Sequence, residues 1–311
     1  MDPRRDRSER IRRKALELGF DACGFVPVLP APEEERRRLL EWLMEGRHAG
    51  MEYMARNTDL RLDPARLVPG SKSIVVALLN YAPRHDPYEG RAVPRLSRYA
   101  WGRDYHKVMR GKLKTLLSWI DREIAPVRGR VFVDSAPLLE RSLAQRAGLG
   151  WIGRNGLLIT RKGSWFFIGE LVIDMELAYD HQEVKDRCGT CTRCVEACPT
   201  QAILPGRTLD ARRCISYWTV EYKGEHFPDE TPQHFSGYAF GCDICQEVCP
   251  WNRRAEPHHT PDFDPDERRM SLTHEEWYKM DEETFHDLFA GTPLMRTGLQ
   301  GMKRNVERSG G

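Results

Sequence analysis

Nine cysteines occur in the 311 residues, and eight of them lie between positions 188 and 249. The first run has the spacing C-x-x-C-x-x-C-x-x-x-C-P and comprises Cys188, Cys191, Cys194 and Cys198. Bacterial ferredoxins use this spacing: three thiolates hold one [4Fe–4S] cluster and the fourth reaches a second cluster. A partial copy of the run follows, with Cys242, Cys245 and Cys249 before another proline. The spacing predicts two iron–sulfur clusters.

The second run lacks one cysteine, because a full repeat would have a cysteine where this chain has Ala239. Cys214 is the remaining cysteine nearby. Crossed ligation, as in two-cluster ferredoxins, then predicts two sets of four. The first set is Cys188, Cys191, Cys194 and Cys249, and the second is Cys198, Cys214, Cys242 and Cys245.

Two structural zinc sites are the alternative for these cysteines. Zinc ribbons present two separated C-x-x-C pairs, whereas here three cysteines stand in register before a Cys-Pro, so the spacing favours iron–sulfur clusters. In a reducing compartment such clustering favours metal over disulfides. Cys23 stands apart in an apolar stretch and is expected to be a small buried residue.

Composition restricts the class of protein only broadly. The 48 Lys and Arg residues nearly balance the 46 Asp and Glu residues, which neither requires nor excludes a nucleic-acid partner. No apolar run approaches the ~18 residues of a membrane span. The N-terminus is basic but has no apolar segment behind it, which argues against a secretory signal. We therefore expect a cytoplasmic protein with no membrane partner.

The sequence pattern divides the chain into three parts, which must together position the cysteines. Residues 1–178 predict one α+β domain with a sheet core. Its expected helices are 8–18, 33–42, 105–124 and 137–147, and its expected strands are 73–80, 131–133, 157–160 and 165–173. Residues 179–254 predict a ferredoxin-like two-cluster domain. Residues 255–311 predict a short, partly helical tail, with helices at 273–280 and 282–288.

Clusters of this kind carry electrons, so a substrate site or second redox centre is expected in the first domain. The G-x-G-x-x-G sequence at 148–153 follows a helix and precedes a strand, which argues against a dinucleotide site. Asp104-x-His106 is similar to a D-x-H-x-x-G cobalt-ligand motif, but Met109 replaces its glycine. Asp134 stands between a strand and a helix, where it could be a helix N-cap or a proton donor, and the local pattern favours the cap.

Several segments together resemble one family. They are MEYMARN (51–57), RYAWGRDYHKV (98–108), VDSAPLLERSLAQRAGLGWIGRNGLLI (133–159), CISYWTVE (214–221) and GCDICQEVCPWN (241–252). With the cysteine runs, they resemble epoxyqueuosine reductases from about residue 10 to residue 254. The resemblance implies a cobalamin-binding sheet domain before the two-cluster domain. It also implies reduction of the epoxide of epoxyqueuosine at the tRNA wobble position to give queuosine, and a relationship to reductive dehalogenases.

The resemblance also implies roles for particular residues. Asp134 would be the proton donor to the epoxide oxygen, as a carboxylic acid kept protonated by burial. Positions similar to those that line cobalamin are Arg56, Asp134, Asn155, Ser216, Cys242 and Asp243. An external electron donor, such as a flavodoxin or ferredoxin, would load the outer cluster, and the inner cluster would pass electrons to cobalt.

Longer members of the family carry HEAT-like repeats that help to hold the tRNA. This chain has room for about one helical pair at ~40–47 residues per repeat. The tRNA contacts are then expected on the core and on basic residues near the C-terminus: Arg253, Arg254, Lys303 and Arg304.

Two other functions remain as hypotheses. A reductive dehalogenase would act on a small molecule, but many respiratory dehalogenases carry an export signal, which this N-terminus lacks. A two-cluster electron carrier would need no substrate site, but roughly 175 residues precede the cysteines. Both observations favour the tRNA-modifying reductase.

Overall fold

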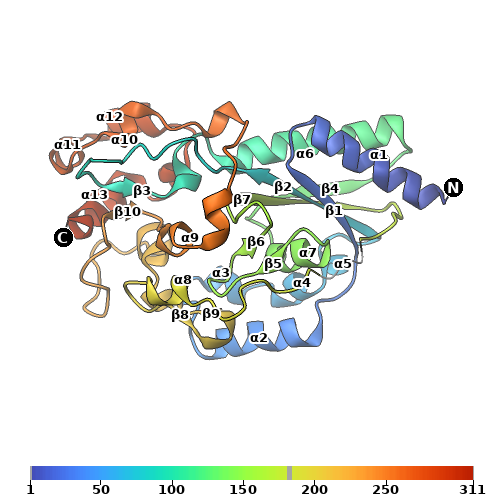
Figure 1. Cartoon of the computed structure of the whole chain (residues 1–311), viewed down its shortest axis with the longest axis horizontal. Helices are drawn as coiled ribbons and strands as arrows, with labels where there is room; N and C mark the ends of the chain where they lie inside the picture. The colour runs from blue at the N-terminus through green and yellow to red at the C-terminus, as the bar shows by residue number, and fades with distance from the viewer. Residues whose placement is uncertain (1, 181–183, 311) are drawn as a thin grey trace.

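A four-stranded antiparallel sheet forms the centre of the computed structural model, which describes residues 2–180 and 184–310 (Figure 1). Its order is β1-β2-β7-β4, with bounds Ala22–Pro27, Ser73–Asn80, Phe166–Ile173 and Gly129–Phe132. β2 pairs with β7 along its whole length and is buried at every position, because it lies between two other strands and is covered on both faces. The α+β class predicted from the sequence is confirmed.

Helices cover both faces of the sheet. α1 (Pro3–Glu17) and α6 (Tyr105–Glu123) lie on the upper side in Figure 1, and α7 (Glu140–Arg146) lies on the lower side. Alternate residues of β2 serve the two cores, since successive side chains of a strand point to opposite faces. Val75, Ala77 and Leu79 pack with α1 and α6. Ile74, Val76 and Leu78 pack with α7.

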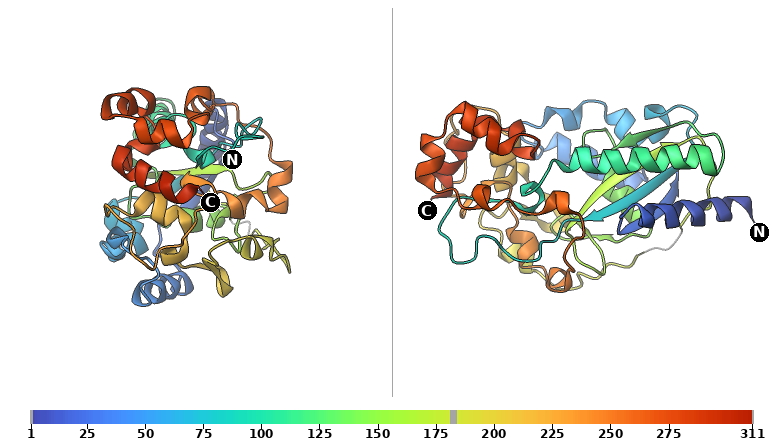
Figure 2. Two further views of the ribbon diagram at one scale, coloured as in Figure 1. Left: turned by 90° about the vertical axis from the view of Figure 1, so that its left-hand side faces the viewer. Right: turned by 90° about the horizontal axis from the view of Figure 1, so that it is seen from above.

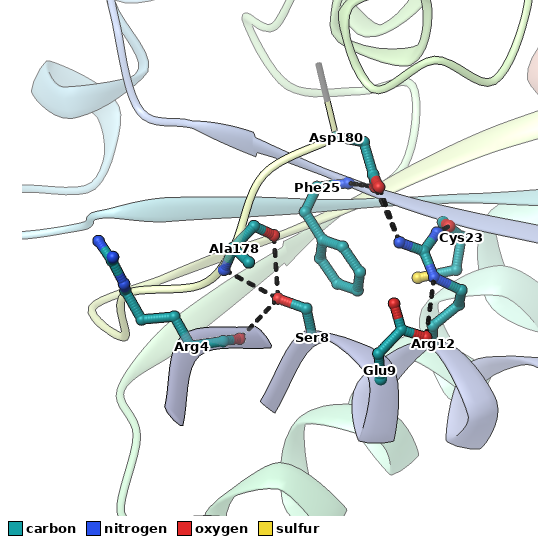
Figure 3. Close-up of polar contacts among 8 residues, drawn as sticks. All are labelled: Arg4, Ser8, Glu9, Arg12, Cys23, Phe25, Ala178 and Asp180. Carbon is teal, nitrogen blue, oxygen red and sulfur yellow. Dashed lines mark hydrogen bonds and ion pairs between the residues drawn. The ribbon is translucent and has the colours of Figure 1, made fainter. Parts of the chain in front are cut away.

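α1 is fastened to the chain that leaves the sheet after β7 (Figure 3). The Ser8 hydroxyl lies 2.9 Å from both the carbonyl oxygen and the amide nitrogen of Ala178. Arg12 forms an ion pair with Asp180 at 2.8 Å, and the backbone N–H of Phe25 donates to the same carboxylate at 2.9 Å. These contacts fix the end of the sheet domain just before the cysteine segment.

The cysteine runs lie on short elements below and beside the sheet. α8 (Arg193–Glu196) contains Cys194 of the first run, α9 (Ile244–Glu247) contains Cys245 of the second run, and the two helices contact each other. Four helices and three two-stranded pairs from other parts of the chain lie outside the four-stranded sheet. They are α2 (Glu33–Met44), α3 (Glu52–Ala55), α4 (Thr58–Leu62), α5 (Pro64–Leu67), β3 (Arg95–Leu96) with β10 (Tyr238–Phe240), β5 (Trp151–Ile152) with β6 (Leu158–Ile159), and β8 (Ile203–Leu204) with β9 (Thr208–Leu209).

The C-terminal helices form a second apolar core at the end of the molecule opposite the N-terminus (Figure 2). They are α10 (Glu267–Met270), α11 (His274–Lys279), α12 (Glu282–Phe289) and α13 (Gly298–Ser309). Trp277, Phe289 and Met302 pack with Leu96 and Phe240 of the β3–β10 pair. Residues 255–310 are therefore packed against the cysteine segment and do not project from it.

Most expected elements appear, with shifted ends. α1 begins five residues before the expected position, because Asp2 caps it and Pro3 occupies its first turn. The expected helix 137–147 is wrong at its start: α7 begins at Glu140, and residues 134–139 form a loop. β1 and α13 were not predicted. Within the described residues, no helix has both the length and the apolar character needed to cross a bilayer.

Candidate functional site

Four cysteines from both runs border one cavity of about 440 Å³. They are Cys188, Cys191, Cys194 and Cys249, which is the first set predicted from the spacing. Cys249 is buried in a small apolar cluster with Trp151 and Ile159, and Cys188 packs against that cluster. The fold thus carries the last cysteine of the second run to the first three of the first run, as a crossed arrangement requires.

The second predicted set, Cys198, Cys214, Cys242 and Cys245, also lies within mutual electrostatic reach. Burial raises the pKa of the Cys245 thiol, and the nearby Cys214, Asp243, Cys194 and Cys198 raise it further. Burial and the Cys198 thiol likewise raise the pKa of Cys214. Cys214 and Cys242 pack against the same apolar cluster.

The cysteines of both sets are free thiols in this structure. Over residues 2–180 and 184–310, no three His, Cys, Asp or Glu side chains converge closely enough to hold a single metal ion. A zinc site needs four ligands at about 2.0–2.3 Å from one point. The ferredoxin spacing of the cysteines is what favours clusters of four iron atoms over zinc.

Two aspartates fasten the cysteine runs to the rest of the protein. Asp186 accepts a hydrogen bond from the backbone N–H of Cys188 at 2.8 Å and pairs with Arg207. Asp243, between two cysteines of the second run, accepts from the Ser97 hydroxyl at 2.5 Å and from the Arg98 N–H at 2.7 Å. Burial raises the pKa of Asp243 to about 6, although these hydrogen bonds oppose that shift.

A second cavity, of about 280 Å³, contains Asp134. Its walls come from the start of α6, the loop after β4, a π-helical turn over Tyr217–Glu221 and the segment before α13. Tyrosine, phenylalanine, methionine and aliphatic side chains supply most of the lining. The polar members include His106, Asp134, Ser216, Glu221 and Arg296. Cys214 also lies in this lining, so the second set of thiols borders the cavity.

Asp134 follows β4 in a left-handed backbone conformation, with φ 57°. Such a conformation is uncommon for a non-glycine residue and costs of order 1–3 kcal/mol. Its N–H donates to Glu140 at 2.5 Å, and a carboxylate oxygen lies 3.0 Å from Nε2 of His106 and 3.9 Å from Nη1 of Arg296. Because α7 begins only at Glu140, the N-cap interpretation of Asp134 is wrong.

His106 lies between two carboxylates. Its Nδ1 is 2.7 Å from Asp104, which also caps α6 through the His106 N–H, and its Nε2 faces Asp134. The Tyr105 ring stacks on the imidazole with centroids 4.1 Å apart. Both ring nitrogens are therefore engaged by carboxylates of the protein itself.

The pKa values of His106 and Asp134 shift in opposite directions. Burial lowers the pKa of His106, but hydrogen bonds and charge from Asp104 and Asp134 outweigh it and raise that pKa to about 9. Burial raises the pKa of Asp134, but the hydrogen bond and charge of His106 outweigh it, so the net shift is downward. These directions favour a proton on His106 and an ionised Asp134, and they argue against the expectation that burial keeps Asp134 itself protonated.

Behind Asp134 lie two further carboxyl groups that the sequence analysis did not assign. Burial, together with the Asp134 charge, raises the pKa of Glu140 to about 8. Glu170, in the middle of β7, is fully buried, and burial plus the neighbouring Glu140 raises its pKa well above the usual value. The sequence did contain a signal for this pair: Glu170 is a charged residue inside the otherwise apolar stretch 165–173.

The remaining predicted cofactor positions are distributed differently. Ser216 lines the second cavity with Asp134. Asn155 lines the first cavity, and its buried Nδ2 has no hydrogen-bond partner among the residues that the structure describes. Arg56 is exposed at the end of α3, and Asp243 is buried beneath the second cysteine run. Neither Arg56 nor Asp243 borders either cavity.

The basic residues expected to contact tRNA also differ from one another. The Arg304 guanidinium lies over the Phe227 ring, 4.4 Å from its centroid, and donates to the Gly224 carbonyl. It is therefore occupied inside the protein. Arg253 and Arg254 are exposed and border the first cavity.

Comparison with known proteins agrees with this arrangement. Residues 61–135 match the family described as "Epoxyqueuosine reductase QueG, DUF1730", and residues 187–252 match the "4Fe-4S double cluster binding domain". The chain is 44% identical over 308 residues to an epoxyqueuosine reductase of Cellulophaga algicola, covering 99% of both chains. The chain belongs to the epoxyqueuosine reductase family.

Solved structures of epoxyqueuosine reductases have the same fold. One, in complex with an epoxyqueuosine-modified tRNA-Tyr stem loop, has a TM-score of 0.87 at 29% identity, and the match covers 97% of this chain and 80% of that one. Another, from Bacillus subtilis, has its catalytic loop swung out of the active site; its TM-score is 0.86 at 30% identity, with the same coverage.

Proposed function

We propose that this protein reduces epoxyqueuosine to queuosine at the wobble position of tRNA, the last step of queuosine formation, in the cytoplasm. The overall change consumes two electrons and two protons, converts the epoxide to an alkene and releases its oxygen as water. Membership of the family supports this function over dehalogenation, and the relative solved with a tRNA stem loop supports tRNA as the partner. The main structural support for this function is the Asp134–His106 pair, which lies in a cavity that Cys214 of the second thiol set borders.

The two thiol sets fit [4Fe–4S] clusters in number and residue type. The lining of the second cavity suits contact with the ring of cobalamin, because its walls are largely aromatic and apolar and its polar groups are few. Ser216 and the carboxylate of Asp134 would face the bound cofactor. When bound, cobalamin would supply a low-potential cobalt centre able to cleave the epoxide carbon–oxygen bond.

The arrangement of the sets gives each a position in the electron path. Cys214 belongs to the second set and to the lining of the reaction cavity, so the second set would hold the inner cluster. The first set lies in a separate cavity that shares no lining residue with the reaction cavity. It would hold the outer cluster, which receives electrons from the donor.

Proton delivery falls to Asp134 and His106 together. An oxygen that develops negative charge on ring opening needs an acid within hydrogen-bond reach. Asp134 borders the cavity, and its carboxylate accepts from the protonated His106 at 3.0 Å. The proton would pass from His106 through Asp134 to the oxygen. Asp104, 2.7 Å from the other ring nitrogen, orients the imidazole and stabilises its charge.

The direct test is anaerobic reconstitution with iron, sulfide and cobalamin, followed by incubation with dithionite and epoxyqueuosine-containing tRNA. Mass spectrometry of the digested nucleosides should show loss of epoxyqueuosine and gain of queuosine. A sample prepared without cobalamin is the matched control. Unchanged epoxyqueuosine, with dehalogenation of a halogenated phenol under the same conditions, would favour the dehalogenase instead.

A further inference from the structure

Five arginines surround the cavity that contains the first set of thiols. We call them the arginine rim; they are Arg154, Arg187, Arg193, Arg253 and Arg254. Among the residues that the structure describes, the lining of this cavity includes no aspartate or glutamate. The whole chain has a formal charge of only +2, so this concentration of positive charge is local.

Four members of the rim have no internal role for their charge. Arg187, Arg193, Arg253 and Arg254 are exposed, and none makes an ion pair with any residue of 2–180 or 184–310. Arg154 differs, because it donates to the Gly189 carbonyl at 2.8 Å. Like charges held close together repel one another, so the rim does not serve the stability of the isolated chain. Its charge is available to an anionic partner.

The rim surrounds cysteine thiols as well as open space. Cys188, Cys191, Cys194 and Cys249 line the same cavity, so a partner seated on the rim would lie directly over the outer cluster. We propose that the arginine rim is the docking surface for an acidic one-electron redox protein of the flavodoxin class. This inference rests on the proposed function, since it names the surface at which the electrons enter.

The chemistry of such a donor matches the reaction. One reduced flavodoxin loses one electron in passing from hydroquinone to semiquinone, and the outer cluster gains that electron. Two docking events therefore supply the two electrons that one epoxide reduction consumes. The two protons come from solvent by way of the protein.

The tRNA phosphate backbone is also anionic, but the location of the rim favours the redox protein. The rim borders the first cavity, whereas Asp134 borders the second, and the two linings have no residue in common. Arg296 is the arginine in the second lining. A tRNA held on the rim would cover the outer cluster and leave it inaccessible to a donor.

The test compares two double variants of equal charge. Arg187→Gln/Arg193→Gln removes two exposed rim charges, and Arg5→Gln/Arg13→Gln removes two exposed charges from α1. Binding of oxidised flavodoxin to the cluster-loaded protein is measured by calorimetry at several salt concentrations. We expect the rim variant to bind at least about tenfold more weakly with a smaller salt dependence, and the α1 variant to bind normally.

Two further measurements keep the result interpretable. Iron content and the visible spectrum should be the same in both variants. Turnover with dithionite, a small reductant, should also be unchanged in both. Turnover driven by flavodoxin should fall in the rim variant. Equal flavodoxin binding in both variants would overturn the proposal. Weaker tRNA stem-loop binding with normal flavodoxin binding would reassign the rim to nucleic acid. Absence of dithionite-driven turnover in the wild type and in both variants would count against the proposed function. The comparison of flavodoxin binding would still test the docking surface.

Discussion

Nε2 of His106 lies 3.0 Å from a carboxylate oxygen of Asp134, while Nδ1 of the same ring lies 2.7 Å from Asp104. Asp104 caps the helix that carries His106, so the start of α6 fixes the orientation of the imidazole. The pKa of His106 is raised to about 9 and that of Asp134 is lowered. The two residues therefore store one proton at the wall of the cavity.

Replacement of Asp134 by asparagine tests the proton-donor role. Asparagine keeps the shape and tolerates the left-handed backbone, but it cannot deliver a proton. We expect Asp134→Asn to fold and to retain both clusters while reducing epoxyqueuosine tRNA at least ~100-fold more slowly. Single-turnover nucleoside analysis measures the rate. A near-normal rate would place the acid elsewhere in the cavity.

The elevated pKa of His106 can be measured without cofactor or substrate. Titration of ¹³C-labelled histidine by NMR should give this residue a pKa near 9, well above the usual 6.5. Asp104→Asn should lower the pKa, because the variant removes one of the two stabilising carboxylates. The chain has ten histidines, and His106→Gln identifies the resonance by its loss. A value at or below 6.5 in the wild type would contradict the charge assignment.

The same pair predicts how stability changes with pH. A histidine whose folded pKa exceeds its unfolded pKa stabilises the fold fully below about 6.5, and this contribution is lost as pH rises through about 9. We expect the free energy of unfolding, measured in urea, to fall between these limits. His106→Gln should show a smaller decrease over the same interval. Parallel curves for the two proteins would contradict the linkage.

Glu170 predicts a different pH dependence. Its folded pKa is raised by burial and by Glu140, so its contribution to stability declines as pH rises above about 4.5, where the unfolded carboxyl ionises. Glu170→Gln removes this titration. We therefore expect the difference in unfolding free energy, variant minus wild type, to increase from pH 5 to pH 8. A constant difference would mean that Glu170 is ionised in the folded protein.

Removal of single cysteines tests the crossed sets. Cys214→Ser should lose about four of eight iron atoms and keep the outer cluster, and Cys249→Ser should lose the outer cluster and keep the inner one. Iron analysis and electron paramagnetic resonance of the reduced proteins distinguish the two outcomes. Retention of both clusters in either variant would refute the assigned sets, and stoichiometric zinc in place of iron would refute the clusters.

The sequence predicted those features that depend on local pattern. The apolar stretches became β2 and β7, and the cysteine spacing predicted two sets of thiols that the fold gathers at two places. Asp134 was found through a motif, although its local pattern favoured a helix cap. The N-cap interpretation was wrong because the chain forms a loop after Asp134 and the helix begins only at Glu140.

Features that depend on tertiary structure could not be predicted in the same way. His106 and Asp134 are 28 residues apart and meet only because α6 and β4 pack side by side. Arg154 and Arg253 join one rim from segments about a hundred residues apart. Arg304, expected at a tRNA surface, instead packs on Phe227, because a guanidinium stacks well on an aromatic ring.

The crossing of cysteines between the two runs has a consequence for how the protein matures. In the proposed crossed arrangement each set draws on both ends of the segment 188–249, so neither iron centre would be completed on a partly folded segment. Insertion of the first cluster would draw the distant ends of this segment together and thereby prepare the thiols of the other. Iron loading should therefore be cooperative, with half-loaded protein scarce during assembly.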